Sequence, residues 1–365
     1  MPLTAGIVGL PNVGKSTLFN AITKQSILAA NYPFATIEPN VGMVTVPDDR
    51  LDFLNELYKP KSLVPTTFEF TDIAGLVKGA SHGEGLGNKF LSHIRDVDAV
   101  VEVVRCFDDS NITHVEGSTD PLRDIETIDI EFIFCDLEVI YNRIGKIEKK
   151  AISTKDKEAL KEVELLKKIK DALENNIPAR KLKYTDDELK MIKAFNLLTL
   201  KPVIYVANIK EDEIGIDNEY VKAVKEYAKK DNAEVIVLCA KIEEELGGFS
   251  DEEKSAYLKE LGIEESGLDK LIRASYHLLG LQTYFTAGEK EVKAWTFKKG
   301  MKAPACAGII HSDFEKGFIR AEVISFDDMK EYKSEAECKA HGKLRSEGKE
   351  YLMQDGDICL FRFNN

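Results

Sequence analysis

The stretch Gly9–Thr17, which reads GLPNVGKST, decides the fold of this 365-residue chain. It follows a short apolar run and carries the spacing Gly-x-x-x-x-Gly-Lys-Ser, fixed at Gly9, Gly14, Lys15 and Ser16. Glycines here let backbone N–H groups turn toward phosphates, while Lys15 supplies a cation and Ser16 a hydroxyl for Mg²⁺. A helix from Ser16 onward would point its positive end at the same charge. A chance match in a chain of this length occurs about once in a hundred, so the stretch predicts a P-loop nucleoside triphosphate site.

Two further segments would complete a metal site. The alternating run 66–72 predicts a strand ending at Asp72, which begins the pattern Asp72-x-x-Gly75. A carboxylate at a strand end can hold Mg²⁺ through water, and the N–H of Gly75 can meet the γ-phosphate. Thr36 lies in a proline-containing loop between the two motifs. We interpret it as a switch threonine that closes onto Mg²⁺ when a γ-phosphate is present; the alternative is an ordinary loop hydroxyl. Ser16, Thr36 and Asp72 are therefore the candidate metal ligands.

The element that reads the base should follow a later strand, and Asn208-Ile209-Lys210-Glu211 takes that place. GTPases carry Asn-Lys-x-Asp there, and the Asp accepts from the N1–H and N2–H₂ groups of guanine. Here Glu211 is one methylene longer, and Ile209 replaces the lysine that usually flanks the base. Adenine lacks those donors, and specificity rests on matched buried polar groups. We therefore expect ATP to be accepted and preferred to GTP, with Cys239-Ala240-Lys241 beside the base.

The residue after Gly75 is Leu76, where many GTPases carry a glutamine that orients the attacking water. A leucine side chain cannot form hydrogen bonds to water. This position therefore predicts either slow intrinsic hydrolysis or the entry of another group on a mobile loop.

Apolar, β-rich runs alternate with helical patterns along much of the chain. The runs are 3–9, 66–72, 99–106, 202–208 and 234–239. This alternation predicts an α/β fold with a mainly parallel sheet. The candidate residues fall after strand ends, where open α/β sheets bind their ligands.

Residues 124–198 interrupt the alternation with a Lys-, Glu-, Leu- and Ile-rich stretch. Apolar residues recur there at three- or four-residue spacing, as expected for one face of a helix: Leu160, Val163, Leu166, Ile169, Leu173 and Ile177. Roughly 75 helical residues exceed what a βα crossover needs. This favours a projecting antiparallel coiled-coil arm over a pair of surface helices that cover the sheet.

The C-terminal region carries short β-like runs at 292–297, 309–311, 318–324 and 357–363. They predict a small β-rich domain with its own core. The expected division is therefore a nucleotide-binding domain in two parts, 1–123 and 199–279, a helical insertion at 124–198, and a C-terminal domain at 280–365.

Composition narrows the classes of function. The net charge of −13 argues against a protein that coats nucleic acid, but residues 141–201 contain 16 basic and 10 acidic side chains, a local charge of +6. Six scattered cysteines without metal-ligand spacing predict reduced thiols and a cytoplasmic location. We find no pattern typical of a signal peptide, and no apolar stretch approaches the length of a membrane span.

Four stretches together resemble one protein family. They are GLPNVGKST at 9–17, NYPFATIEPN at 31–40, DIAGLVKGASHGEGLGNKFL at 72–91 and NIKE at 208–211. They look like the Obg-related P-loop proteins and, within these, the YchF/Obg-like ATPase branch. The run QDGDICLFRFN at 354–364 resembles that family's TGS domain, so the resemblance covers essentially the whole chain. It implies a G domain with a helical insertion, a C-terminal β-grasp (TGS) domain, hydrolysis of ATP in preference to GTP, and association with the ribosome, by its large subunit.

The resemblance also implies roles for individual residues. The phosphates would be held by Asn12, Val13, Gly14, Lys15, Ser16 and Thr17. Ser16 and Thr36 would bind Mg²⁺, and Ile209, within Asn208–Glu211, would meet the adenine. Leu76 would make the chain a hydrophobic-substituted NTPase like its relatives.

Two further positions bear on activity and its control. His114 matches a family histidine on a flexible loop that is proposed to help position water, which makes Lys15 and His114 the candidate catalytic residues. The alternative for His114 is a polar surface residue. Many family members have a cysteine, linked to redox control, before the switch threonine. Here the residue is Ala35, which puts redox regulation through this site in doubt.

Three alternatives to a slow ATPase remain open. The chain can be a GTPase, or a dual-specificity NTPase, with relaxed reading of the base. It can be a nucleotide-gated binding module that barely hydrolyses. It can also be an adaptor that contacts RNA through the basic arm and the TGS domain, although solvated surfaces are the usual fate of Lys/Glu-rich helices.

Overall fold

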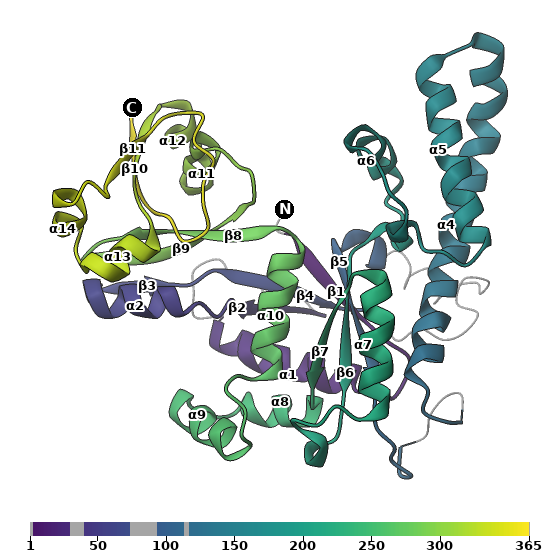
Figure 1. The fold of residues 1–365 in the computed structure, drawn as a ribbon, viewed down its shortest axis with the longest axis horizontal. Coiled ribbons are helices and arrows are strands. Elements are labelled where there is room, and N and C mark those ends of the chain that lie inside the picture. Colours follow the sequence, from purple (N-terminus) through teal and green to yellow (C-terminus); the bar gives the residue numbers. More distant parts are fainter. Residues whose placement is uncertain (1–2, 30–39, 74–92, 113–116, 365) are drawn as a thin grey trace. The chain divides into compact units, whose positions relative to one another are not determined.

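The computed structural model describes residues 3–29, 40–73, 93–112 and 117–364 (Figure 1). These residues form two compact units. The first comprises residues 3–28, 40–42, 69–73, 93–112 and 117–271, and the second comprises residue 29 and residues 43–68 and 272–364. Each unit contains most of one six-stranded sheet. No helix among the described residues is long and apolar enough to cross a membrane.

The sheet of the first unit has the strand order β2-β4-β1-β5-β6-β7. These strands are β1 (Thr4–Val8), β2 (Val41–Thr45), β4 (Thr67–Asp72), β5 (Ala99–Arg105), β6 (Val203–Asn208) and β7 (Glu234–Leu238). The five from β4 to β7 in this order are parallel. Every residue of β5 and β6 is buried, which fits strands covered on both faces. The predicted α/β class is confirmed, and each predicted strand of this sheet is present to within about a residue at its ends.

Helices connect and flank these strands. They are α1 (Lys15–Ala29), α7 (Glu219–Asp231), α8 (Ala240–Leu246), α9 (Asp251–Glu260) and α10 (Gly267–Leu278). Because β4, β1, β5, β6 and β7 are parallel, the carboxyl ends of these strands meet at one edge of the sheet. The loops after β1, β5, β6 and β7 therefore lie next to one another.

The helical insertion is a hairpin of α4 (Pro121–Thr154) and α5 (Lys157–Glu174) (Figure 1). Asp120 caps the start of α4, Lys155 ends it in the left-handed conformation, and Asp156 caps the start of α5. The hairpin has an apolar core in which Ile140, Leu166 and their neighbours are fully buried. The predicted antiparallel arm is confirmed. It is followed by η2 (Ala179–Lys181), α6 (Asp186–Ile192), η3 (Lys193–Phe195) and η4 (Leu198–Leu200).

The predicted apolar helix face is wrong at one of its positions. Ile177 lies beyond the end of α5, and its side chain is 41% exposed. The helix stops at Glu174 because the following N–H groups of Asn175 and Asn176 turn back to the carbonyls of Ala172 and Leu173. The apolar spacing continued by chance for one position after the helix had ended.

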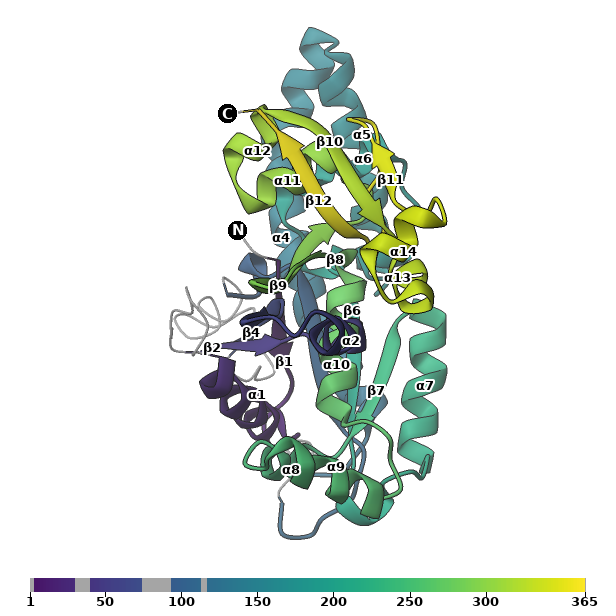
Figure 2. The same cartoon turned by 90° about the vertical axis from the view of Figure 1, so that its left-hand side faces the viewer.

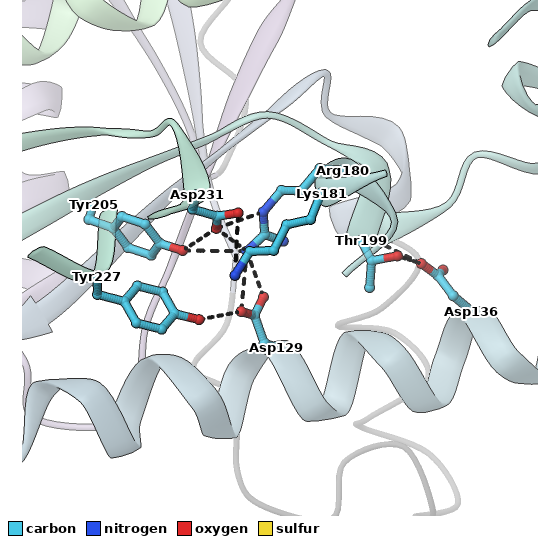
Figure 3. Close-up of polar contacts among 8 residues, drawn as sticks. All are labelled: Asp129, Asp136, Arg180, Lys181, Thr199, Tyr205, Tyr227 and Asp231. Carbon is cyan, nitrogen blue, oxygen red and sulfur yellow. Dashed lines mark hydrogen bonds and ion pairs between the residues drawn. The ribbon is translucent and has the colours of Figure 1, made fainter. Parts of the chain in front are cut away.

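Buried charges join the root of the arm to the sheet (Figure 3). The guanidinium of Arg180 donates to Asp129 of α4 at 3.0 Å and to Asp231 of α7 at 2.8 Å. The hydroxyl of Tyr205, on β6, donates to Asp231 at 3.1 Å, and that of Tyr227 donates to Asp129 at 3.2 Å. We call these five residues the arm-root cluster.

A second buried carboxylate fixes the same root. Asp136 of α4 accepts from the backbone N–H groups of Leu198 and Thr199 at 2.9 and 2.8 Å, and from the Thr199 hydroxyl at 2.7 Å (Figure 3). Burial raises the pKa of this carboxyl, and the bonds from Thr199 and Leu198 act in the opposite direction. The outgoing and returning ends of the insertion are thus joined where it meets the sheet.

The second unit has the strand order β11-β10-β12-β8-β9-β3. Figure 2 labels β8 to β12 of this sheet. Its strands are β3 (Ser62–Val64), β8 (Leu281–Ala287), β9 (Glu291–Lys298), β10 (Phe318–Ile324), β11 (Arg345–Glu347) and β12 (Ile358–Phe363). β12 runs parallel to β8 and antiparallel to β10, and β8 and β9 form an antiparallel pair. With the helix α11 (Ala303–Ile310) after the β8–β9 pair, this is the predicted β-grasp arrangement.

Both faces of this sheet are covered. On one face, α11 (Ala303–Ile310) and α12 (Ser312–Lys316) pack on a core that includes Tyr284. On the other face, α2 (Asp49–Tyr58), α13 (Phe326–Tyr332) and α14 (Glu335–Ala340) pack around Phe285. The opposite orientations of these neighbouring residues follow from the two-residue period of a strand.

Residues 309–311 do not form the predicted β-like run. Ile309 and Ile310 are the last residues of α11, which carries Pro304 in its first turn. Ala303, Cys306 and Ala307, at helical spacing, are fully buried in the core. A short apolar run bounded by glycine does not distinguish a strand from a buried helix end. Here the small residues at helical spacing pack on the sheet, and the segment forms a helix.

The segment 43–68 was not expected in the second unit, since the predicted division places it within 1–123. Its strand β3 pairs with β9, with Ser62 opposite Glu291. Leu51 and Leu54 of α2 are buried in the same core as Phe285. The chain therefore enters this unit early, leaves it, and returns at its C-terminal part.

Candidate functional site

The phosphate loop lies at the carboxyl end of β1 and runs directly into α1. Asn12 and Gly14 have φ angles of 65° and 100°, in the left-handed region that favours Asn and Gly. A Cβ atom on Gly14 would lie 2.1 Å from Nδ2 of Asn208, and one on Gly9 would lie 2.8 Å from the carbonyl oxygen of Val103. Both motif glycines are thus required by the close approach of the loop to β5 and β6.

Lys15 and Asp72 meet at this edge of the sheet. β1 and β4 pair in a register that sets Ile7 opposite Asp72, so the end of β4 lies beside the phosphate loop. The ammonium of Lys15 forms an ion pair with Oδ1 of Asp72, and their side chains are only 10% and 20% exposed. Ser16 is exposed at the first turn of α1. The predicted phosphate cation and a predicted Mg²⁺ ligand are therefore in contact.

A cavity of about 1320 Å³ opens over these loops. It is lined by residues that follow β1, β5, β6 and β7, and it is large enough for a nucleotide. Eight of the residues predicted to bind nucleotide line it together: Asn12, Gly14, Lys15, Ser16, Thr17, Asn208, Ile209 and Glu211. Val13 is buried instead, and its carbonyl faces Asn208.

Asn208 joins three loops of the site. Its side-chain Nδ2 donates to the carbonyl oxygen of Val13 at 2.9 Å, and its Oδ1 accepts from the N–H of Ala240 at 2.9 Å. The side chain is buried, so these bonds satisfy backbone groups that water does not reach. The asparagine of the base-reading element therefore also fixes the phosphate loop.

The base-reading end of the cavity combines apolar and charged groups. Ile209 is 3% exposed, and its N–H donates to the carbonyl of Leu238 at 2.9 Å. Glu211 begins η5 (Glu211–Glu213), and its carboxylate lies 3.8 Å from the ammonium of Lys241. Both of these side chains are largely exposed and line the cavity. The carboxylate that replaces the guanine-reading Asp thus has a cation as its neighbour.

Cys239 also lines the cavity. Burial raises the pKa of its thiol, and bonds from the backbone of Ile242 and Lys241 partly offset this. A thiol with a raised pKa is mostly protonated near neutral pH and is a weak nucleophile. The position therefore supplies a small apolar surface beside Ala240.

Sequence reasoning missed one wall of the cavity. Phe107, Asp109 and Ile112, in the loop after β5, line it, as do Glu244 and Leu261. The position of the loop after an apolar strand was the only available signal, because no motif marks these residues. Thr36, Gly75, Leu76, His114 and Ala35 lie outside the described residues, so their predicted roles remain predictions.

Ser16 and Asp72 supply the kinds of donor that Mg²⁺ prefers, a hydroxyl and a carboxylate oxygen. They lie at the same edge of the sheet: Ser16 follows Lys15 in α1, and Asp72 is in contact with the Lys15 ammonium. Within the described part of the chain, His, Cys, Asp and Glu side chains do not gather in threes as they would in a metal site built from protein ligands alone. A site with few protein ligands is typical of Mg²⁺, which is usually bound together with substrate phosphates and water. The residues present therefore fit this ion.

Two family models match the chain. Residues 4–135 match a model described as a 50S ribosome-binding GTPase. Residues 281–364 match a model for the C-terminal region of YchF GTPases, described as a protein of unknown function.

Similar proteins cover the whole chain. The ribosome-binding ATPase YchF of Bacillus subtilis is 62% identical over 366 residues and covers 100% of both chains. The protein of the same name from Escherichia coli O157:H7 is 52% identical over 364 residues, also covering 100% of both chains. The solved structure of the Schizosaccharomyces pombe YchF GTPase superposes with a TM-score of 0.90 at 44% identity, covering 99% of this chain and 97% of the other.

Proposed function

This chain belongs to the YchF family, and from that membership we propose that it is a Mg²⁺-dependent, cytoplasmic P-loop ATPase that associates with the ribosome. It binds ATP in preference to GTP, hydrolyses it slowly to ADP and phosphate, and uses the bound nucleotide as a switch. Relatives from Bacillus subtilis and Escherichia coli carry the name ribosome-binding ATPase.

One observation carries the preference for ATP. The phosphate loop and Ile209 line the same cavity, so a triphosphate held by the loop extends its base toward an isoleucine instead of a lysine. The nearby carboxylate of Glu211 is paired with Lys241. Guanine needs a free acceptor for two N–H donors, whereas adenine does not, so this end of the cavity favours adenine.

Lys15, Ser16 and Asp72 have distinct roles in this proposal. Lys15 moves from Asp72 to the β- and γ-phosphates when nucleotide binds. Ser16 and Asp72, with Thr36, would then hold Mg²⁺, which neutralises charge on the phosphates. Thr36 joins this set from its sequence context alone. The Lys15–Asp72 ion pair keeps both groups at the site before nucleotide enters.

Slow hydrolysis follows from Leu76, which cannot orient water. We propose that His114 supplies part of that role from its loop. Turnover then depends on how often this group reaches the γ-phosphate, and association with the ribosome is a means of changing that frequency.

The test compares ATP and GTP directly. Affinities are measured with fluorescent analogues of both nucleotides, and phosphate release is measured with and without ribosomes, using Lys15→Ala as the control. We expect tighter binding of ATP, slow turnover, and loss of both in the control. Tight GTP binding without measurable ATP affinity would favour the GTPase alternative, for which Glu211 at the cavity is the specific observation. Turnover equal to that of Lys15→Ala, with nucleotide-dependent ribosome binding, would favour a pure switch.

The arm supplies a candidate contact for ribosomal RNA. Lys149 and Lys150 are exposed near the tip of α4. Lys167 instead pairs with Glu148 at 2.6 Å, and Lys168 lies over the ring of Tyr184. The first pair of lysines is therefore the better choice for a test, since replacing the second pair also disturbs packing within the insertion.

We expect Lys149→Glu with Lys150→Glu to weaken ribosome binding and to reduce its salt dependence. The matched control is Lys229→Glu with Lys230→Glu, the same charge change on the exposed face of α7. Equal ribosome binding by both double variants would show that the charged side chains of the arm face solvent and do not contact the ribosome.

A further inference from the structure

A single helix connects the nucleotide cavity with the arm. α4 begins at Pro121, after the loop that follows β5, and continues for 34 residues to Thr154. At about 1.5 Å per residue it spans roughly 50 Å. Asp120 caps its first turn, and the hydroxyl of the preceding Thr119 donates to the carbonyl of Phe107, a cavity-lining residue, at 3.3 Å. The start of this helix is therefore bonded to the cavity wall, and its end forms one side of the arm.

The loop before α4 is fixed along its length. The buried guanidinium of Arg105, the last residue of β5, donates to three of its backbone carbonyls at 3.0 to 3.1 Å, those of Phe107, Asp109 and Ile112. All three of these residues line the cavity. Because hydrogen bonds from a charged donor are stronger than neutral ones, this part of the wall is expected to move as one piece.

α7 begins beside the base-reading element. Its N-cap is Asn218, whose Oδ1 accepts from the N–H of Val221 at 2.9 Å. The Nδ2 of Asn218 donates to the carboxylate of Glu213 at 3.0 Å and to the carbonyl of Cys106 at 2.8 Å. Glu213 in turn accepts from the N–H of Lys210, which lines the cavity, at 3.2 Å. The start of α7 is therefore also bonded to the surroundings of the nucleotide site.

The arm-root cluster joins these two helices at a second place (Figure 3). Arg180 lies in η2, on the returning side of the insertion, and its guanidinium binds both Asp129 of α4 and Asp231, the last residue of α7. The side chains of these three residues are 11%, 9% and 0% exposed. The hydroxyl of Tyr227, on α7, donates to Asp129 at 3.2 Å and so bonds the two helices directly. One residue of the insertion thus binds both helices that start at the cavity.

Burial makes this junction stiff. Removing one partner of a buried ion pair is strongly destabilising, because the remaining charge is left without compensation. Asp136 of α4 adds a second connection, through the backbone N–H groups of Leu198 and Thr199 on the returning side. Tightly packed elements of this kind shift as units instead of deforming continuously.

We propose that the arm-root cluster couples the nucleotide cavity to the arm, with Arg180 as the positioning residue. α4 and α7 transmit a change at the cavity wall to the cluster, and the cluster converts it into a change in the orientation of the arm. This inference rests on the proposed function, because it names the regulation of the same nucleotide site. Coupling between two binding sites is reciprocal. A ribosome bound to the arm therefore changes the affinity for nucleotide by the same factor by which nucleotide changes the affinity for the ribosome.

The first test measures the ribosome affinity of the full chain with a non-hydrolysable ATP analogue and with ADP. The ratio of the two dissociation constants is the coupling factor, which for allosteric proteins lies between about 5 and 150. We expect Arg180→Met to bring this ratio to within about twofold of one, and Tyr227→Phe to reduce it in part. Nucleotide affinity of the free variants should stay within about twofold of wild type, because the cluster lies apart from the residues that line the cavity. A purely structural role would lower stability without changing the ratio in the folded protein.

The second test follows the arm without ribosomes. The six cysteines are buried, so cysteines introduced by Ser153→Cys at the arm tip and Glu252→Cys on α9 can be labelled selectively with a donor and an acceptor dye. We expect the energy transfer between the dyes to differ between the ATP analogue and ADP. This difference should be lost when Arg180→Met is added.

Arg143→Met is the matched control. Arg143 pairs with Glu162 at 2.6 Å between α4 and α5, beyond the root of the arm. It should keep the wild-type ratio and the wild-type change in energy transfer. If Arg180→Met does not fold, as judged by thermal unfolding, Tyr205→Phe with Tyr227→Phe decides the matter, because this double change keeps the ion pairs and removes two hydroxyl bonds to the cluster carboxylates.

Three results would overturn the inference. The first is a wild-type response to nucleotide in folded Arg180→Met and in the double tyrosine variant. The second is an equal loss of response in Arg143→Met, since the general integrity of the arm would then be responsible. The third is a wild-type chain that binds ATP but whose arm does not respond to it in either test. Failure of the proposed function has a different signature, because the wild-type chain would then bind no ribosomes or no ATP. Absence of ribosome binding alone leaves the energy-transfer test intact, and absence of nucleotide binding overturns both proposals.

Discussion

The side-chain amide of Asn208 donates to the backbone carbonyl of Val13 at 2.9 Å, which joins the base-reading element to the phosphate loop. The same side chain accepts from the N–H of Ala240 at 2.9 Å. One asparagine therefore sets the distance between the two ends of the nucleotide site. Gly14 makes this possible, because a Cβ there would occupy the place of the amide nitrogen.

Replacing this asparagine should affect both stability and binding. Asn208→Ala leaves the buried carbonyl of Val13 and the N–H of Ala240 without their partner, at a cost of roughly 1–3 kcal/mol for each group. We expect a lower free energy of unfolding in urea and weaker binding of ATP and of tripolyphosphate. Asn20→Ala is the control, since Asn20 is an exposed amide bonded to Glu244; it should change stability by less than about 0.5 kcal/mol. Similar values for the two variants would contradict the role given to Asn208.

The base-reading motif can be converted. Ile209→Lys with Glu211→Asp restores the GTPase pattern Asn-Lys-x-Asp at 208–211. Because Asp then supplies the acceptor that guanine requires, the ratio of GTP to ATP affinity should rise at least about tenfold. Lys241→Gln, which only removes the cation beside Glu211, should change the ratio by at most about fivefold, the range of an exposed ion pair. Competition between labelled ATP and unlabelled GTP measures this affinity ratio in both variants. An unchanged ratio in the double variant would show that residues other than Ile209 and Glu211 select the base.

The arm-root cluster should be sensitive to loss of its cation. Arg180→Met removes the guanidinium that pairs with the buried carboxylates of Asp129 and Asp231, and Asp231 then keeps the ammonium of Lys181 at 3.5 Å. Loss of one partner of a buried ion pair typically costs about 3–5 kcal/mol. Arg143→Met removes an arginine from a more exposed pair with Glu162 on the same arm and should cost less than about 1 kcal/mol. Urea unfolding measures the difference, and hydrogen exchange in α4 and α5 shows whether the arm loosens first. Equal stability of the two variants would mean that the cluster does not secure the arm.

We expect Glu102 to make the stability of the protein depend on pH. Burial raises the pKa of its carboxyl well above the ordinary value of 4.5, followed in importance by repulsion from Asp129. Its Oε1 lacks a hydrogen-bond partner within the described part of the chain. Above pH 4.5 the unfolded chain releases this proton while the folded chain keeps it, so the stability contributed by the protonated group is lost as pH rises toward the folded pKa.

Glu102→Gln removes the titration and keeps the shape. Its stability relative to wild type should therefore increase with pH by up to about 1.4 kcal/mol per pH unit, until the folded pKa is reached. Urea unfolding between about pH 5.5 and 8 measures this. For Glu226→Gln, at an exposed position of α7, the free energy of unfolding should depend on pH as it does in wild type. A constant difference between Glu102→Gln and wild type over this range would show that Glu102 is ionised in the folded protein.

The features predicted from the sequence are those that short stretches determine. The phosphate loop, the strand ending at Asp72 and the helical arm each depend on local spacing, and the structure contains all three. The order of the loops at the sheet edge followed from the parallel arrangement, which brought Ile209 and Lys15 to one cavity. The uses of these residues in binding remain predictions.

Other features were out of reach because the conformation of a loop, the packing on a sheet or a distant partner decides them. Arg105 reads as a polar residue at the end of a strand, and only the folded loop turns three carbonyls toward it. Ile309 belongs to an apolar run that suits a strand as well as a helix. The partners of β3 are encoded far later in the chain, and Ser62–Val64 carries no sign of them.

That last pairing bears on how the protein is made. During synthesis, α2 and β3 leave the ribosome long before β8 and β9. The apolar side chains of Leu51 and Leu54 therefore lack their core partners during most of translation. The segment must remain free of wrong partners until the final part of the chain arrives. A gene fragment cut before residue 281 would carry this unmatched edge permanently, and a fragment that begins there would lack its border strand. A single crossover therefore cannot exchange the second unit whole, because residues 43–68 and 272–364 lie on either side of 69–271 in the chain.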